Sequence, residues 1–469
     1  MSEVNAVTKF TSYGWLVCIW ALVVPFQYGY HISALNQIQA VLTCRTTPHS
    51  SSNGLSTCIS MSDATFSLIT SMFTVGGFLG SCAASNVMDR RGRKAALQFS
   101  GFLVAVGSGL MGVASSTVLL LLGRFLIGCG AGLGLCTVPI FLAEIAPPNI
   151  RGSVGVLNQL GIVTGIMITQ LLGLRMATPT LWRFVLLFSS FASIVQLCLS
   201  QFIVETPVWL KQQGRADDFG DAQRCLFQQR GVISVEGALL DEAGDASQNE
   251  LDDHWETPRS TSVSVTELLT SRELRRPLVV VSSVMISQQL SGMNVFLYYS
   301  NNILSHVLSE SGAYVSLGIT IVNTLMTFPP ILLIDRVGRR QLLLTSVVGA
   351  LVSLVLTGYG LNTGMMVTSS ISIVTFLPNL FCRSFAVGLG PVPFVIVSEV
   401  APPHAVPALS SVALAMNWVA NFLVGLAFLP LRNKLSGGDP AKEGRVFYVF
   451  AGLLFLCSFV FFRNYRSRI

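Results

Sequence analysis

Charged residues are scarce in this sequence: they make up 11% of its 469 residues, and the mean hydropathy is +0.64. A soluble domain carries about 25% charged residues, so a chain of this size could not cover a water-facing surface. The sequence also lacks a CxxC pair, a nucleotide-binding loop, metal-ligand spacing and a Ser–His–Asp context. We therefore expect a membrane protein that is not an enzyme, with no cofactor and no metal. The formal charge of +6 is diffuse and predicts no nucleic-acid partner.

A cleavable leader is not apparent either. The first residues, MSEVNAVTKF, are short and polar, and the apolar run behind them has no small-residue cleavage site. We interpret that run as a retained first helix.

Twelve apolar runs are long enough to span a bilayer, which takes about 20 residues each. They lie near 13–36, 64–86, 95–114, 117–142, 153–174 and 183–204, and then near 277–305, 312–334, 341–361, 368–397, 408–430 and 446–462. Only helices or closed barrels satisfy the backbone within lipid. The prediction is an all-α membrane protein with two pseudo-symmetric six-helix bundles.

One long polar interval separates the two sets of runs. We expect an N-terminal bundle over residues 1–204, a linker with short helices over 205–276, and a C-terminal bundle over 277–469. Basic residues favour the cytoplasmic side of membrane proteins. RRGRK, RVGRR, the linker and RNYRSRI all fall on one side if both termini are cytoplasmic, although the basic loop RNKLSGGDPAKEGR then lies outside.

A glycine-rich segment lies within the fourth apolar run. GCGAGLG at residues 128–134 resembles a dinucleotide-binding fingerprint, but it follows no strand, so close helix packing through small residues explains it better.

Cys44 and Cys58 share a polar loop after the first run. They could pair if that loop faces an oxidising compartment, and the sequence leaves this open.

Two short patterns occur twice, in the same order and at nearly the same offset. DRRGRK and AEIAPPNIRG in the first half are echoed by DRVGRR and SEVAPPHAVP in the second. Charged helix ends of this kind can pair and hold the inner ends of helices together, and paired halves are typical of transporters. The predicted cytoplasmic gate consists of Asp89, Arg91, Arg93, Glu144, Arg151, Asp335, Arg339, Arg340 and Glu399.

Over nearly its whole length the chain resembles the sugar porter family of the major facilitator superfamily. The resemblance rests on GRFLIG, the two DRxGR loops, VPIFLAEIAPPNIRG, NQLGIVTG, QQLSGMN, VNT, GPVPF and NWVANF. It is similar to animal glucose facilitators and to the fungal vacuolar-type branch. The resemblance implies a hexose carrier that works by alternating access.

Side-chain amides match sugar hydroxyls because they both donate and accept hydrogen bonds, and they avoid an intramembrane charge. Aromatic faces would pack against the ring. Any one of these amides could instead bond two helices together. The predicted substrate-binding residues are Gln159, Gln288, Gln289, Asn294, Asn323, Phe394, Asn417 and Trp418.

The sequence departs from the family pattern at several of its motifs. Ala386 stands where the family's glucose transporters usually have Glu, and Phe394 replaces a Trp, so the resemblance does not single out glucose. Val406 stands where Arg151 has its counterpart, which predicts a weaker second gate. Arg383 lies inside an apolar run, where it either reaches out to the membrane surface or contacts substrate.

His31 occupies the position where proton-coupled relatives often have Asp, facing the residue that is here Arg124. Histidine can carry a proton near neutral pH, whereas the charge of Arg124 opposes a second positive charge. Facilitated transport is therefore favoured, with proton-coupled transport or a non-transporting sugar sensor as alternatives. We expect a multi-pass monomer in the plasma or vacuolar membrane, with a monosaccharide, lipid and, in the coupled alternative, protons as partners.

Overall fold

The computed structural model describes residues 9–44, 51–52, 55–228, 263–292, 312–363, 383–437, 439 and 442–465. The predicted binding residue Asn294 lies outside these residues, and so do Tyr298 and Tyr299 of the same apolar run near 277–305. Within them, nine helices are long and apolar enough to cross a membrane. Large apolar side chains such as Ile19, Val118 and Leu332 are exposed on the outside of the helices, which is the surface that a protein in lipid presents.

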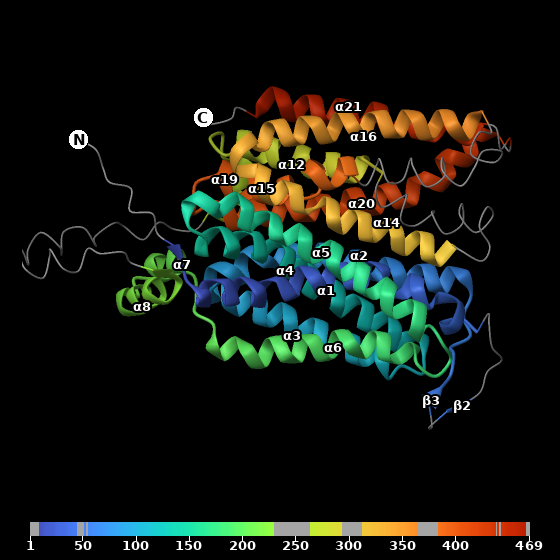
Figure 1. The fold of residues 1–469 in the computed structure, drawn as a ribbon, viewed down its shortest axis with the longest axis horizontal. Coiled ribbons are helices and arrows are strands. Elements are labelled where there is room, and N and C mark those ends of the chain that lie inside the picture. The colour runs from blue at the N-terminus through green and yellow to red at the C-terminus, as the bar shows by residue number, and fades with distance from the viewer. Residues whose placement is uncertain are drawn as a thin grey trace, which may run out of the picture.

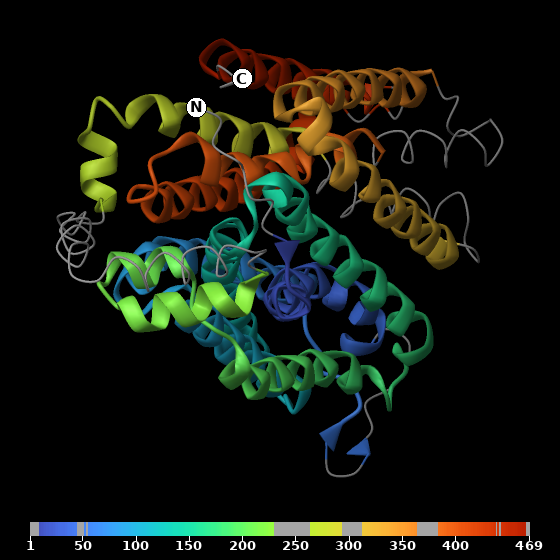
Figure 2. The ribbon, with the colours of Figure 1, turned by 60° about the vertical axis from the view of Figure 1, so that its left-hand side comes forward.

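Six long helices form the N-terminal bundle, and each matches one predicted run (Figures 1 and 2). They are α1 (Ser12–Leu42), α2 (Asp63–Arg91), α3 (Arg93–Gly112), α4 (Thr117–Ile145), α5 (Arg151–Met176) and α6 (Trp182–Leu199). The short 3-10 turn η1 (Pro148–Ile150) precedes α5, and a second one, η2 (Ser200–Phe202), follows α6.

In the C-terminal bundle the described residues form three long helices and several shorter ones. They are α12 (Arg275–Leu290), α14 (Gly312–Met326), α15 (Phe328–Val337), α16 (Arg339–Asn362), the π-helix η3 (Phe385–Leu389), α19 (Val392–Val400), α20 (Val406–Ser436) and α21 (Arg445–Asn464). The predicted run 312–334 is wrong as a single helix, since α14 ends before Thr327 and α15 begins at Phe328. Pro329 and Pro330 follow at once, and proline cannot donate the N–H bonds that would continue α14.

Glycines bring α2 and α4 into backbone contact. A Cβ placed on Gly80 would lie 2.1 Å from the carbonyl oxygen of Cys129, and one on Gly132 would lie 2.0 Å from that of Gly77. Any side chain larger than hydrogen would force the two helices apart. The GCGAGLG run is thus a packing surface, as the sequence predicts.

Short elements attach the first part of the linker to the N-terminal bundle. Strand β1 (Lys9–Phe10) pairs with β4 (Phe227–Gln228), which directly follows α8 (Ala216–Leu226). The Tyr13 hydroxyl donates to the carbonyl of Phe202 at 2.7 Å and accepts from the N–H of Val204 at 3.0 Å. Together with α7 (Pro207–Gln212), α8 marks one end of the molecule, which we name the linker side (Figure 1).

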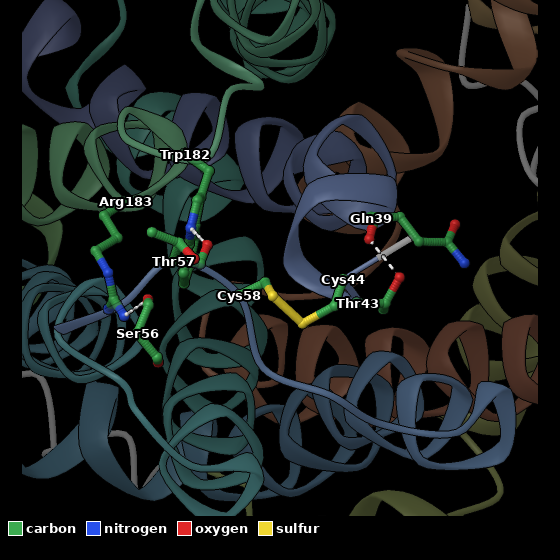
Figure 3. Close-up of a disulfide and its surroundings, with 8 residues drawn as sticks. All are labelled: Gln39, Thr43, Cys44, Ser56, Thr57, Cys58, Trp182 and Arg183. Atoms are coloured by element: carbon green, nitrogen blue, oxygen red, sulfur yellow. Dashed lines mark hydrogen bonds between the residues drawn. A yellow bond between two sulfur atoms is a disulfide. The ribbon is translucent and has the colours of Figure 1, made fainter. Parts of the chain in front are cut away.

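The opposite end, which we name the disulfide side, carries the bond between Cys44 and Cys58 (Figure 3). Its strands are β2 (Ser51–Ser52) and β3 (Leu55–Ser56). Trp182 Nε1 donates to the Thr57 carbonyl at 2.7 Å, and the Arg183 guanidinium donates to the Ser56 carbonyl at 2.8 Å. The loop is therefore fastened covalently to α1 and by hydrogen bonds to α6.

Loss of the disulfide should lower stability, because the bond closes a loop with a sequence separation of 14 and such loops are worth up to about 3 kcal/mol. We expect Cys44→Ser to lower the melting temperature in detergent by several degrees. A reducing agent should lower the melting temperature of the wild type by the same amount and leave that of Cys44→Ser unchanged. Cys198→Ser, which removes an exposed free thiol on α6, is the control. An equal effect of the reducing agent on wild type and Cys44→Ser would contradict the bond.

Candidate functional site

The predicted amides gather where the two bundles meet. Gln288 Nε2 donates to the carbonyl oxygens of Leu389 and Gly390 at 2.8 and 3.1 Å. The Leu389 carbonyl is available because the residue four positions later, Pro393, has no N–H to donate to it. From the other bundle, the amide of Gln159 lies against Gly390, since a Cβ there would approach its Nε2 to 3.2 Å. Amides from both bundles thus converge on one backbone segment.

Asn417 joins this cluster through α20. Its Nδ2 donates to Gln288 Oε1 at 3.0 Å and to the Met285 carbonyl at 3.1 Å, while its Oδ1 accepts from Gln289 Nε2 at 3.0 Å. All four residues are at least nine-tenths buried. This amide cluster, Gln159, Gln288, Gln289 and Asn417, unites four of the predicted binding residues.

The other predicted binding residues lie at different places. Asn323 is buried on α14, and its Oδ1 has no hydrogen-bond partner among the described residues. Phe394 is buried on α19, one turn beyond Gly390. Trp418 follows Asn417 and meets Tyr28 and Phe73 edge to face, with ring centroids 5.7 and 5.5 Å apart.

Trp418 also lines a cavity of about 410 Å³ between the bundles. Its aromatic wall includes Tyr28, Phe66 and Phe73, and its polar wall includes His31, Gln39, Ser67, Thr70, Ser71, Thr74, Arg124 and Asn421. The lining comes from the C-terminal half of α1, the N-terminal half of α2, the middle of α20 and, through Arg124, α4. A volume of this order is typical of small-molecule sites. The amide cluster does not line the cavity in this conformation, although Asn417 adjoins Trp418.

His31 and Arg124 are nearly fully buried, at 1% and 2% exposure. Arg124 Nη1 donates to the carbonyl oxygen of His31 at 2.8 Å, so the two residues are neighbours as predicted, although this bond joins the guanidinium to the backbone. The Arg124 guanidinium also lies 5.4 Å from the centre of the Phe73 ring. Arg383, the other intramembrane arginine, is exposed and lies outside the cavity lining.

Two charge clusters occupy the linker side, one in each bundle. Arg93 pairs with Glu144 at 3.0 Å, and Arg339 pairs with Glu399 at 2.7 Å and with Asp335 at 3.0 Å. Arg91, Arg151 and Arg340 are exposed and form no ion pair within the described part of the chain. Five of the predicted gate residues thus form these ion pairs, and the Asp89 carbonyl accepts from Trp209 Nε1 at 3.3 Å.

Glu205, next to Arg93 on the linker side, was missed by sequence analysis. Its carboxylate accepts the N–H groups of Arg93 and Lys94 at 3.2 and 3.0 Å, which are the first of α3. Gly92 makes room for it, because φ there is +93° and a Cβ would approach Glu205 Oε2 to 2.2 Å. Burial raises the pKa of Glu205, and the donated N–H groups act in the opposite direction.

Ser153, also missed, connects the bundles. Its N–H and hydroxyl both donate to Asp335 Oδ2, at 2.8 and 2.7 Å, and the hydroxyl lies 2.6 Å from the Ile331 carbonyl. Other contacts also join the two bundles, and we name this whole interface the seam. Ser85 N–H donates to Ser411 Oγ at 2.8 Å, and Ser410 Oγ donates to the Cys136 carbonyl at 3.0 Å. The two bundles are therefore closed against each other on the linker side.

Gly152→Ala should open this closure. The new Cβ would lie 2.2 Å from Asp335 Oδ1 and 2.6 Å from Arg339 Nη2, so it would displace the carboxylate that holds Ser153. Cys136 is fully buried at the seam and is a native probe. We expect its maleimide labelling, followed by peptide mass spectrometry, to rise several-fold. Gly452→Ala, where nothing lies within 4 Å of the Cβ, is the control, and equal labelling of both variants would refute the closure.

Comparisons with known proteins agree with this architecture. The family described as "Sugar (and other) transporter" matches residues 17–466. A probable metabolite transport protein of Saccharomyces cerevisiae is 30% identical over 91% of this chain and 87% of its own. Mouse facilitated glucose transporter member 4 is 34% identical over 87% of this chain and 80% of its own.

Among solved structures, the proton:xylose symporter XylE, from E. coli, bound to 6-bromo-6-deoxy-D-glucose has a TM-score of 0.74 at 19% identity, with 96% of each chain covered. At that identity the likeness establishes the fold alone. The family match and the two sequence relatives extend over most of the chain. The protein therefore belongs to the sugar porter family of the major facilitator superfamily and is an integral, multi-pass membrane protein.

Proposed function

We propose that this protein carries a monosaccharide, in the first place a hexose, across a membrane by alternating access. The observation that carries the proposal is the pairing of a cavity on the disulfide side with a closed seam on the linker side. Closure at one end beside an accessible cavity is one of the two states that an alternating-access carrier needs. The relatives named as glucose transporters support a hexose.

The amide cluster and Trp418 are proposed to bind the sugar, together with Asn294, Asn323 and Phe394. Each amide offers a donor and an acceptor to neutral hydroxyls. In the present conformation these groups bond to one another and to backbone carbonyls. Sugar binding would exchange some of those bonds for bonds to hydroxyls, so that few buried polar atoms lose a partner.

Release to the other side requires the linker-side contacts to break. The paired residues of the gate, Arg93 with Glu144 and Arg339 with Asp335 and Glu399, would hold the closed state. Asp335 is central because it bonds both to Arg339 within its bundle and to Ser153 of the other. Arg91, Arg151 and Arg340 would find their partners in another conformation.

Facilitated transport is the proposed mode, because the positive charge of Arg124 next to His31 opposes a second positive charge there. Proton coupling at His31 is the second candidate. It is favoured by the fold shared with a proton:xylose symporter and by a buried Nδ1 of His31 without a hydrogen-bond partner among the described residues.

The disulfide supports the proposed orientation. Such bonds persist in oxidising compartments, so the loop between α1 and α2 would face the outside or a lumen. Both termini and the linker would then be cytoplasmic, where the positive-inside rule also places them. We further propose a monomeric carrier without enzymatic activity, in the plasma or a vacuolar membrane, divided into bundles 1–204 and 277–469 joined by the linker 205–276.

Uptake of labelled glucose and fructose into proteoliposomes tests the function directly. We expect saturable uptake that stops at equal concentrations and is unchanged by an imposed pH gradient. Accumulation driven by the gradient would replace facilitated transport by proton coupling. Binding of either sugar without flux would favour a sensor, and neither binding nor flux would refute a hexose carrier.

Gln288→Leu should raise the KM for hexose about fivefold, since it removes the group that links Asn417 to η3 and a hydrogen bond of this kind is worth about 1 kcal/mol. Its amount in the membrane should not change. Gln98→Leu makes the same substitution on α3, where the amide bonds Ser200 near the linker side, and should leave the KM unaltered. An unchanged KM for Gln288→Leu would remove the amide cluster from the binding site.

A further inference from the structure

His31 belongs to a chain of hydrogen bonds between α1 and α6 that sequence analysis did not anticipate. Its Nε2 lies 2.6 Å from the hydroxyl of Ser189, and that hydroxyl donates to the side-chain oxygen of Gln27. The Gln27 amide nitrogen in turn donates to the Ser189 carbonyl and to Ser193 Oγ, both at 3.0 Å. All four residues are at least nine-tenths buried.

This chain determines which nitrogen of His31 carries the proton. A backbone carbonyl can only accept, so the Gln27 atom that faces the Ser189 carbonyl must be the NH₂ group, and the other must be its oxygen. The Ser189 hydroxyl has a single proton, which it gives to that oxygen. Its oxygen can then only accept from His31, so Nε2 bears a hydrogen. In the neutral ring Nδ1 is left as an acceptor.

That acceptor has no hydrogen-bond partner among the described residues, although it is buried. His31 also lines the cavity, next to Tyr28 and Ile32 of the same helix and Arg124 of α4. Buried acceptors without a partner are rare in folded proteins and indicate a missing ligand or water. The hydroxyl-rich surface formed by Ser67, Thr70 and Ser71 shows that polar ligands can be accommodated there.

We propose that Nδ1 of His31 accepts a hydrogen bond from a hydroxyl of the transported sugar, and that Gln27 and Ser189 are positioning residues that hold the ring for this contact. The inference rests on the proposed function and makes His31 a substrate-contacting residue in place of a proton carrier. Arg124, which donates to the His31 carbonyl, supports a neutral ring. The ligand is thus a polyol that offers a hydroxyl donor at the α1 wall of the cavity.

Two amide substitutions separate the two ring nitrogens. The amide of asparagine lies about as far from the backbone as Nδ1, and that of glutamine about as far as Nε2. His31→Asn should therefore keep the KM for D-glucose within about threefold of wild type in proteoliposomes, whereas His31→Gln should raise it about tenfold. If His31→Gln kept the wild-type KM and His31→Asn raised it, only the bond to Ser189 would matter, and the inference would be overturned.

Singly deoxygenated glucoses identify the contact itself. One of them should bind the wild type about tenfold more weakly than glucose, and His31→Gln should bind that analogue and glucose equally. If the variant discriminates between them as the wild type does, Nδ1 touches no hydroxyl. Ser189→Ala should raise the KM with little change in kcat, and Ser189→Thr, which keeps the hydroxyl, should restore it.

Failure of this inference can be told apart from failure of the proposed function. A wild type that neither binds nor transports glucose or fructose would overturn both. A wild type that transports glucose, with the same KM in the Asn and Gln variants, would overturn only the role of His31. Gln98→Leu serves again as the control for an amide substituted outside the cavity.

Discussion

The first N–H groups of two helices, and the carboxylates that accept from them, govern the closed end of the molecule. Helix starts leave N–H groups without partners in the helix and carry a partial positive charge. Glu205, the first residue of the linker, satisfies those of α3, whereas Asp335 satisfies that of Ser153 on α5 from the other bundle. The first contact fixes the N-terminal bundle to its linker. The second exists only while the bundles are closed.

The chemistry of the interior follows from a second constraint, the cost of charge in lipid. Between the bundles the structure uses amides, aromatic rings and hydroxyls, with Arg124 as the charged residue of the cavity lining. That guanidinium bonds a backbone carbonyl and lies over an aromatic ring, which compensates its burial. Such an interior recognises a neutral ligand through many weak directional bonds.

Much of the fold was predictable because spans follow from long apolar runs and gate residues from a repeated pattern. The close contact of α2 with α4 was also predictable, since glycines that recur along a helix usually mark a surface where another helix packs closely. The break at Thr327 could have been predicted from two prolines, but the length of the run concealed it. The amides were identified by motif, whereas their mutual bonds form only where α12 packs against α20. The π-helix at Phe385–Leu389 has no clear pattern in sequence either.

The polar chain behind His31 was beyond sequence analysis for a different reason. Gln27, Ser189 and Ser193 are ordinary polar residues in apolar runs, and they become a unit only when α1 packs against α6. Glu205 was hidden similarly, since its partners are backbone groups more than a hundred positions earlier in the chain. A backbone group can accept or donate a hydrogen bond whatever its side chain, so the residue types of such partners do not reveal the contact.

The backbone contact between α2 and α4 has a mechanical consequence. Two helices whose main chains touch, with no side chains between them, have no deformable layer and cannot slide or tilt independently. The C-terminal bundle has close backbone contacts of its own, since a Cβ on Gly388 would lie 2.3 Å from the carbonyl oxygen of Leu342. It also has breaks, because α14 and α15 are separated at Thr327 and a π-turn leads into α19. Bending is therefore expected at those breaks, between segments that backbone contacts hold together.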